Sequence, residues 1–458
     1  MSLVMRFFTP SVVMLAIVSG LSAAPTNIDL ETTLRLAGAN NLQIKIAREK
    51  LSEARERESV ARNKRLPWIS VGSALRQHQD QIQTVDGKLI NADKRSLSAG
   101  VGLNLMWEPS EVYYQNLVAK QNTRAEDAAM AIERAGVIYQ STVAYGELLR
   151  ASAIVEVEEN SLQLVNRHYA QVKASAEAGL VFAGDVHRVA AQQARTQVNV
   201  RQAQEAVVVA SARLASLLRL DPSVQLEPAK ENLVPLDLID RKLELGGLVT
   251  QALAQRQELT QFDARVEATK QELDGARYGP LVPTIGAQIN YGGLGGGAGL
   301  GDPTRDFASS SDCALTVAWR VGPGGLFDRS RIRLNESRLR RSKLEMDAMQ
   351  DQIRREVVEQ HARVASLADQ LSLLSSICES AEKTVELSRQ RRESGVGLVL
   401  EDITAEQELT RARSDYITCI TRYNQAQQAL VWALGSPVTG LESGDWVLLR
   451  SNGLSNPK

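Results

Sequence analysis

The sequence is short of several things that most globular chains of its size contain. Aromatic residues make up 4% of its 458 residues, and there are only three cysteines and four histidines. The formal net charge is −1, so the chain has no excess of basic residues with which to attract a nucleic acid. Ala, Leu, Glu, Gln and Arg dominate long tracts instead, which favours long helices over a compact, aromatic-rich core.

The scarce reactive residues form no catalytic pattern. The cysteines Cys313, Cys378 and Cys419 are odd in number and widely spaced, which argues against a disulfide framework. An antiparallel hairpin turning near Leu398 would bring Cys378 and Cys419 level, so an oxidised pair is an alternative to the favoured interpretation, packing in a small core. No two histidines have metal-ligand spacing on one helical face, and no nucleotide-binding or hydrolase motif occurs. We expect no metal, no cofactor and no enzymatic activity.

Only one apolar run stands out, and it is short. Residues 1–24 have a basic start, the run "VVMLAIVSGL" and a small-residue exit, which together predict a secretory signal cleaved after residue 23 or 24. No other segment has the roughly 18 consecutive apolar residues of a helical membrane span. The chain is therefore expected to be exported, and any membrane insertion would have to use strands.

The chain repeats itself with an offset of 216 residues. Pro67 in "LPWISVGSAL" corresponds to Pro283 in "VPTIGAQINY", and Gly179 in "AGLVFAGDV" corresponds to Gly395 in "SGVGLVLED". This duplication predicts one repeat over residues 25–220, a linker over 221–247, a second repeat over 248–435 and a C-terminal segment over 436–458.

Each repeat is predicted to contain two long helices that meet at a short break. Apolar or small residues recur at alternating steps of three and four, the 3.5-residue period of a coiled coil, and the register survives the 216-residue shift. Glu158 alone breaks the pattern, and its counterpart is Leu374. The breaks lie at Gly179–Gly184 and Gly395–Gly397, and the helix before each break can run about 60 residues, or roughly 90 Å.

Four shorter segments, at about 67–76, 96–107, 283–291 and 311–321, alternate apolar and polar residues with period two. This pattern suits a half-buried strand of a soluble sheet as well as a strand of a membrane barrel. The signal peptide and the aromatic residues Trp68, Trp107, Tyr291 and Trp319, which we assign to a membrane girdle, favour the barrel. Four strands cannot close a barrel, so copies of the chain are expected to pool their strands.

Two further tracts have unusual compositions. The stretch "YGGLGGGAGLGDP" contains seven glycines and nearly spells a dinucleotide-binding motif, yet a strand rather than a helix follows it. We predict an external hairpin loop there. The arginine-rich run "DRSRIRLNESRLRRSKLE" has its arginines all around a helix, so we interpret it as a solvated helix surface.

Over almost its whole mature length the chain resembles the TolC-like outer-membrane efflux and secretion channels. The matching features are "ARNKRLPWISVG" and "ARYGPLVPTIGA", the repeated Gly-to-acid element at the breaks, and the helix ends "LASLLRLDP" and "LVWALGSP". The resemblance implies a mainly α protein with strands: a homotrimer with a 12-stranded outer-membrane barrel, a periplasmic tunnel of twelve helices, and an equatorial belt formed by 221–247 and 436–458. It also implies partners, namely a periplasmic adaptor and an inner-membrane pump or secretion ATPase.

The resemblance also suggests where the pore narrows. In the family, acidic residues near the helix breaks ring the pore, and Asp185, Glu401 and Asp402 occupy these positions. Three copies of such a carboxylate would form an electrostatic filter. The alternative is an acid favoured by the helix N-terminus, which for Asp185 suits the residue equally well. The family's latching arginine is Gly397 here, and a second family acid is Thr404.

The predicted function is a passive exit duct for small molecules or proteins across the periplasm and outer membrane. A soluble periplasmic coiled-coil scaffold or adaptor is the alternative, because it also explains the helices and the signal. It leaves the four lipid-patterned strands without a role.

Overall fold

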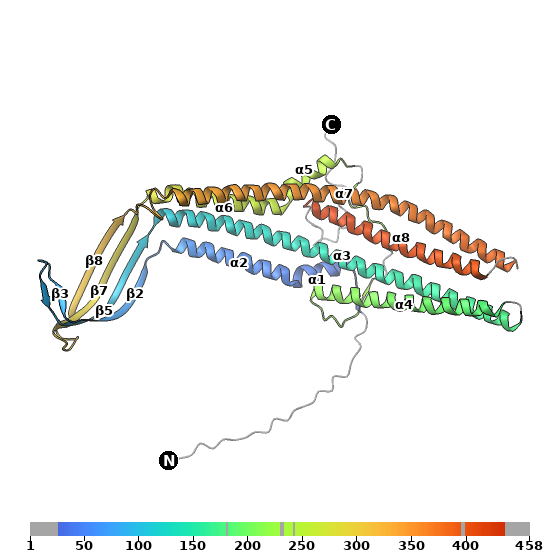
Figure 1. Ribbon diagram of the computed structural model, residues 1–458, viewed down its shortest axis with the longest axis horizontal. Helices are drawn as coiled ribbons and strands as arrows, with labels where there is room; N and C mark the ends of the chain where they lie inside the picture. Colours follow the sequence, from blue (N-terminus) through green and yellow to red (C-terminus); the bar gives the residue numbers. More distant parts are fainter. Residues whose placement is uncertain (1–25, 180–181, 230–232, 241–242, 395–398, 436–458) are drawn as a thin grey trace, which may run out of the picture.

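The computed structural model describes residues 26–179, 182–229, 233–240, 243–394 and 399–435. The chain forms a long rod with a four-stranded sheet at one end and a pair of helical hairpin tips at the other (Figure 1). The predicted signal at 1–24 and the C-terminal segment at 436–458 lie outside the described residues.

The rod is built on two helices that run from the sheet to the tips. These are α3 (Pro109–Glu177, 69 residues) and α7 (Arg329–Glu393, 65 residues), each roughly 100 Å long. On the sheet side of the rod, α2 (Leu42–Asn63) packs on α3, and α6 (Gln257–Tyr278) packs on both α3 and α7. On the tip side, α4 (Ala183–Leu218) pairs with α3, and α8 (Val399–Ala433) pairs with α7. The expected mainly α class with strands is confirmed.

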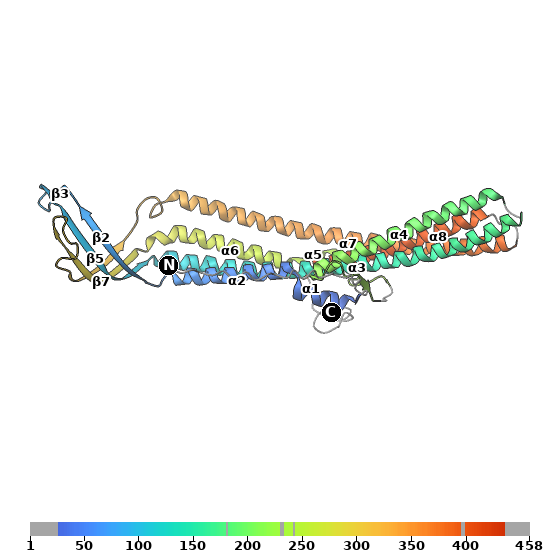
Figure 2. The same ribbon diagram turned by 90° about the horizontal axis from the view of Figure 1, so that it is seen from below.

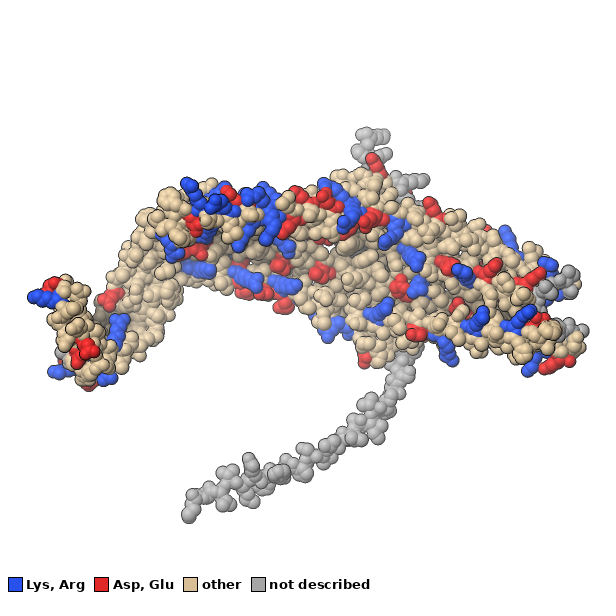
Figure 3. Space-filling model, viewed as in Figure 1, with Lys and Arg blue, Asp and Glu red and all other residues tan. Residues whose placement is uncertain are grey.

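The four main strands form one antiparallel sheet in the order β2-β5-β7-β8. They are β2 (Trp68–His78), β5 (Lys94–Trp107), β7 (Thr284–Ala298) and β8 (Ala308–Ala318). The central pair, β5 with β7, joins the two repeats, with Trp107 opposite Ile285. One face exposes apolar side chains such as Val71 (79% exposed) and Leu315 (74% exposed). Between its tip and the helices, the sheet shows almost no charged side chains in Figure 3.

Most of the glycine tract is part of the sheet, so its prediction as a hairpin loop was wrong for residues 291–298. Strand β7 continues through it to Ala298, with Gly292 opposite Gly100 and Gly297 opposite Arg95. The two strands approach so closely that a Cβ on Gly292 would lie 2.2 Å from the carbonyl oxygen of Ala99. Glycine is used here because only a residue without a side chain permits that approach. The connecting loop is confined to residues 299–307.

Short elements gather around the middle of the rod (Figure 2). Strand β1 (Thr26–Ile28) pairs in parallel with β6 (Leu226–Pro228), and helices α1 (Leu30–Asn40) and α5 (Leu245–Gln255) lie beside the long helices. A 3-10 turn, η1 (Gly279–Leu281), leads from α6 into β7. At the far end of the sheet, β3 (Gln81–Gln83) and β4 (Leu89–Asn91) form a small hairpin within the loop between β2 and β5.

A buried arginine ties four helices together at this middle level. Arg256 stands between α5 and α6, and its guanidinium pairs with Glu258 at 2.6 Å and with Glu356 of α7. The same guanidinium lies 4.6 Å from the ring centre of Trp432 on α8. Because a buried charge needs partners, these contacts hold the ends of α5, α6 and α8 against α7.

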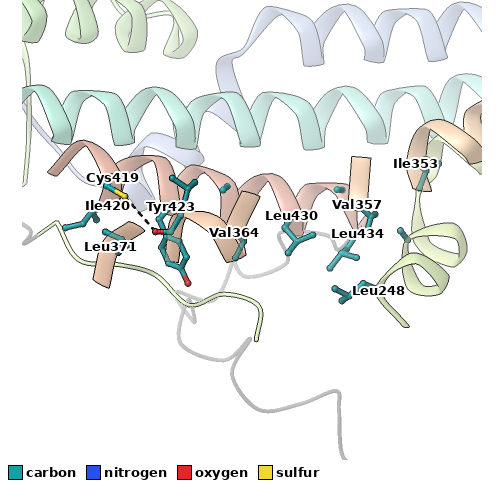
Figure 4. Packing of buried hydrophobic residues seen from close by; sticks show 14 residues of the cluster. Leu248, Ile353, Val357, Val364, Leu371, Cys419, Ile420, Tyr423, Leu430 and Leu434 are labelled. Atoms are coloured by element: carbon teal, nitrogen blue, oxygen red, sulfur yellow. Dashed lines mark hydrogen bonds between the residues drawn. The ribbon is translucent and has the colours of Figure 1, made fainter. Parts of the chain in front are cut away.

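The hydrophobic core of the second repeat lies between α7, α8 and α5. Leu371, Cys419 and Tyr423 lie in this core with Leu430 (Figure 4). The thiol of Cys419 donates to the carbonyl of Leu367 at 3.8 Å. All three cysteines are free, with Cys313 exposed and Cys378 half-buried, so Cys419 has the small-core position expected for it.

Glu158 is a polar residue in the α3–α4 seam. It is half-buried, and burial raises the pKa of its carboxyl, against the opposing hydrogen bond from Asn199. Its Oε2 is buried and has no hydrogen-bond partner within the described ranges. The raised pKa means that the folded chain binds this proton more tightly than the unfolded chain does. The contribution of this site to the free energy of unfolding is therefore lost as the pH rises through the pKa of the folded state.

Replacing Glu158 by leucine, the residue that stands at the equivalent place in the second repeat, should stabilise the protein by about 1 kcal/mol at neutral pH. The change removes a buried carboxylate and adds apolar contact in the seam. Thermal unfolding measured at pH 5 and pH 8 would check it, and the gain should be larger at pH 8. Glu159→Leu, on the exposed neighbour, is the control. An equal gain at both pH values would contradict the claim that the charged carboxylate of Glu158 destabilises the folded chain.

Candidate functional site

The rod ends in two helical hairpin tips, where the sequence placed its functional residues. Helix α3 ends at Glu177, and Gly179 follows with φ of +73°, a conformation that glycine adopts without strain. Helix α4 begins at Ala183, one residue before Gly184, where a Cβ would meet the ring of Phe182 at 2.4 Å. The counterparts Gly395 and Gly397 lie outside the described residues.

Two of the three predicted pore acids lie near the surface of the tips. Asp185 stands in the first turn of α4, and its Oδ1 lies 3.2 Å from Nη1 of Arg188. Glu401 stands in the first turn of α8, and its Oε2 lies 3.4 Å from Nη1 of Arg391 at the end of α7. Both ion pairs are at least partly exposed, so both carboxylates remain accessible to ions in the surrounding water.

The third acid, Asp402, is placed differently. Its side chain is 4% exposed, and its Oδ2 lies 2.9 Å from Nε of Arg392 on α7. The contact is an ion pair rather than an aligned hydrogen bond. In the single chain this carboxylate therefore points between helices instead of toward solvent.

Arg392 also connects the second repeat to the first. Its Nη1 lies 2.7 Å from Nδ1 of His168 on α3, and Nε2 of the same imidazole lies 2.6 Å from Oε1 of Glu406 on α8. A guanidinium can only donate, so Nδ1 accepts and Nε2 carries the proton that it donates to Glu406. Both His168 and Glu406 are buried. We call His168, Arg392, Asp402 and Glu406 the tip cluster.

Sequence reasoning missed three members of the tip cluster, His168, Arg392 and Glu406. A comparison of these positions with their counterparts in the other repeat could have found them. The residues 216 positions away from His168, Arg392 and Glu406 are Thr384, Ala176 and Ala190. Ionisable residues thus occupy slots that hold small or uncharged residues in the other repeat. Such one-sided polar substitutions in a seam mark a specific contact, because burying charge is costly unless each group is paired.

The girdle residues lie on the sheet, but not all at one level. Trp68 begins β2 and Trp107 ends β5, whereas Trp319 directly follows β8 and donates its Nε1–H to the carbonyl of Leu281 at 3.3 Å. These three tryptophans stand where the sheet meets the helices. Tyr291 lies in the middle of β7, because the strand runs on through the glycine tract. The girdle assignment stays a prediction for all four.

The described residues were compared with two common kinds of site, a metal centre and a membrane-spanning helix. They contain no group of three or more histidine, cysteine or acidic side chains that is arranged to hold a metal ion. Of the helices in the described ranges, none combines the length and the apolar character that a membrane span requires.

Comparisons with known proteins relate the second repeat to a family and the whole fold to solved structures. Residues 248–436 match the family described as outer membrane efflux protein. Among solved structures, the fold is similar to a membrane protein from Pseudomonas aeruginosa (TM-score 0.75, 18% identity, 89% of this chain and 93% of that one). It is also similar to the outer membrane protein VceC of Vibrio cholerae (0.72, 18%, 89% and 96%) and the CmeC outer membrane channel of Campylobacter jejuni (0.75, 13%, 89% and 85%). Among curated proteins, none matches this chain in sequence.

The paired long helices, the open lipid-patterned sheet and these matches define the fold as that of the TolC-like outer membrane channels. The family match covers residues 248–436, which is less than half of the chain.

Replacing Arg392 by alanine should loosen the hairpin of α3 and α4 from the hairpin of α7 and α8. The change removes one contact to His168 and leaves the buried Asp402 unpaired. Losing one partner of a buried pair costs about 3 kcal/mol. Hydrogen exchange of α3 residues 163–177 and α8 residues 399–410 should become faster. Arg391→Ala, which removes only the exposed pair with Glu401, is the matched control. Equal protection in both variants would contradict a tie through Arg392.

Proposed function

We propose that three copies of the chain pool their strands into one barrel and form the exit duct of a tripartite efflux pump or a type I secretion system. The observation that carries this proposal is the open sheet, which has an apolar exposed face and two unpaired edges. A periplasmic scaffold would need no such sheet.

The two edges of the sheet are different strands, and this favours a ring. Strand β2 stands at one edge and β8 at the other. The helices pack in the order α2-α3-α6-α7, so α2 and α7 flank the bundle on the same two sides. In hydrocarbon each unpaired backbone N–H or C=O costs several kcal/mol, so β8 of one copy must pair with β2 of the next. Such head-to-tail contacts close into a ring when the rotation permits it. The number three comes from the family resemblance.

The duct would be passive and would depend on partners for energy. Its proposed partners are a periplasmic adaptor, which would dock on the helical end, and an inner-membrane pump or secretion ATPase. The resemblance to tripartite-pump channels supports both. The hairpin tips at the far end of the rod from the sheet are the natural place for the adaptor to dock.

Within the duct, we assign the narrow ring at the tips to Glu401 and Asp185, whose carboxylates reach solvent. Three copies of Glu401 around one axis would attract cations and disfavour anions. Asp402 shares the predicted position, but its carboxylate is paired with Arg392, so its proposed role is to hold the tip cluster together.

A trimer should be visible directly. The protein extracted from the outer-membrane fraction in mild detergent should run on gels as a band of three times the chain mass, and heating should convert it to the single chain. Exposed lipid-patterned strands are expected to survive extraction only when their edges are paired. Recovery as a soluble periplasmic monomer would contradict the duct and support the scaffold.

Replacing Glu401 by alanine should lower the cation selectivity of the channel and weaken its block by divalent cations, since three negative charges leave the constriction. Reversal potentials in planar bilayers under a salt gradient measure the selectivity. Asp369→Ala, which removes an exposed acid of α7 more than 20 residues from the tip, is the control. Unchanged selectivity in the Glu401 variant would remove this residue from the pore.

A further inference from the structure

A cavity of about 560 Å³ opens on one face of the rod near its middle, where α8 packs against both α3 and α7. Its lining combines two arginines, several carboxamides, one tyrosine and small or aliphatic side chains. Arg363 comes from α7, Arg422 and Gln425 come from α8, and Tyr139 comes from α3. Among the described residues that line this cavity, none is acidic. A space of this size can take a drug-sized molecule.

The two arginines of the cavity have no acidic partner. Neither Arg363 nor Arg422 forms an ion pair or a side-chain hydrogen bond within the described part of the chain, and both are exposed. Other arginines of the same two helices do form such pairs, for example Arg354 of α7 with Asp351. Because a guanidinium forms charge-assisted hydrogen bonds with carboxylate, sulfonate and phosphate groups, two unpaired guanidinium groups beside a cavity favour a bound anion.

An acid that contacts the cavity wall already has its own partners. Oε1 of Glu147 on α3 accepts a hydrogen bond from Nε2 of Gln425 at 2.7 Å, and its Oε2 lies 2.8 Å from Nη2 of Arg150. The negative charge of Glu147 is therefore balanced by Arg150. The positive potential of Arg363 and Arg422 remains available to a ligand.

The duplication indicates that helix packing does not require these two arginines. The residues 216 positions before Arg363 and Arg422 are Glu147 and Ala206. One slot thus carries the opposite charge in the first repeat and the other carries a methyl group, although the helices have the same plan. The arginines are a feature of the second repeat alone.

Beside the arginines the cavity offers an aromatic surface. The ring of Tyr139 stacks on Trp432, with ring centres 5.8 Å apart. Burial raises the pKa of the Tyr139 hydroxyl, and the positive charge of Arg363 opposes that rise, so the guanidinium lies within electrostatic reach of the phenol. Gln360 lines the same cavity, and its buried Oε1 has no hydrogen-bond partner in the described ranges. An anion on an aromatic or aliphatic body suits this combination.

The cavity opens on the side of α8 that faces away from residues 233–240. The backbone N–H groups of Leu236 and Ile239 donate to the side chains of Asn424 and Gln427, at 2.7 Å and 3.1 Å. Arg422 lies on the far side of the helix from both of these side chains, because successive residues of a helix are turned by roughly 100°. In the proposed duct the equatorial belt surrounds the wall of helices from outside, so the cavity faces the lumen.

We propose that this cavity is a binding site in the lumen for an organic anion, a solute with a carboxylate, sulfonate or phosphate group on an aromatic or aliphatic body. Arg363 and Arg422 bind the anionic group, and Tyr139 packs against the body. The proposal rests on the exit duct proposed above and names a class of solute that it carries. The acids at the tips do not cancel this site, because Tyr139 lies roughly 55 Å along α3 from Glu177, several Debye lengths away.

Binding can be measured with naphthalene-1,5-disulfonate, a water-soluble aromatic dianion, by isothermal titration calorimetry on the full chain in a non-ionic detergent. The wild-type protein should bind it. Arg363→Gln with Arg422→Gln should weaken binding roughly 100-fold, about tenfold for each charge-assisted contact that is lost. Arg354→Gln with Arg411→Gln removes the same charge from other exposed positions of α7 and α8 and is the matched control, which should bind as the wild type does. The aromatic cation benzyltrimethylammonium should not bind.

Channel recordings test whether the site faces the lumen. In planar bilayers the disulfonate should lower the conductance of the wild type and of the control variant, and it should leave the conductance of the Arg363→Gln, Arg422→Gln variant unchanged. Binding in the calorimeter without block of the channel would place the site outside the lumen and overturn its role in transport. Circular dichroism and the heat-sensitive trimer band verify that each variant is folded and assembled.

Failure of this site and failure of the duct give different results. A trimer that does not bind the disulfonate, or whose two double variants bind it equally well, would overturn the site and leave the duct intact. A chain that binds the disulfonate through Arg363 and Arg422 but is recovered as a soluble monomer would overturn the duct, and with it the role in transport. The two readouts are independent because a single chain supplies the described lining of the cavity.

Discussion

The backbone of the two edge strands is the constraint on which the rest of the structure depends. Strands β2 and β8 each have one side without a hydrogen-bonding neighbour in the single chain, and the sheet they bound carries apolar side chains on its exposed face. Water would satisfy those backbone groups, but lipid cannot, so in the proposed duct insertion into lipid and assembly of the copies become one event. The helices follow the strands in the same order, and whatever pairs the strands must therefore also place α7 beside α2.

Much of this architecture could be predicted from the sequence because each pattern in one repeat can be checked against the same pattern in the other. A residue such as Gly179 carries little information alone, but the same residue type 216 positions later makes a shared local structure far more probable. The heptad steps survived the shift, and with them the long helices and their turning points were predictable. The class of fold followed from patterns rather than from single residues.

What could not be predicted depends on contacts across the chain. The glycine tract was interpreted as a loop because glycine usually breaks a strand. Here Gly292 lies directly opposite Gly100 in the β5–β7 pair, and the strand continues. Asp402 and Glu401 are adjacent in sequence, yet one is buried against Arg392 and the other reaches solvent. Their difference depends on which side of α8 faces the neighbouring helices, and a local acidic pattern does not contain that information. His168 was passed over for the same reason, since its partners come from α7 and α8.

The two longest helices have a mechanical consequence. Helices α3 and α7 cross the middle of the rod without a break, while α2 and α6 end there on one side and α4 and α8 on the other. Uninterrupted helices bend gently and have no hinge at which to fold. Movement at the tips must then appear as bending or unwinding distributed along tens of residues. A displaced tip would then be returned by the elasticity of the whole helix rather than by the reversal of a hinge.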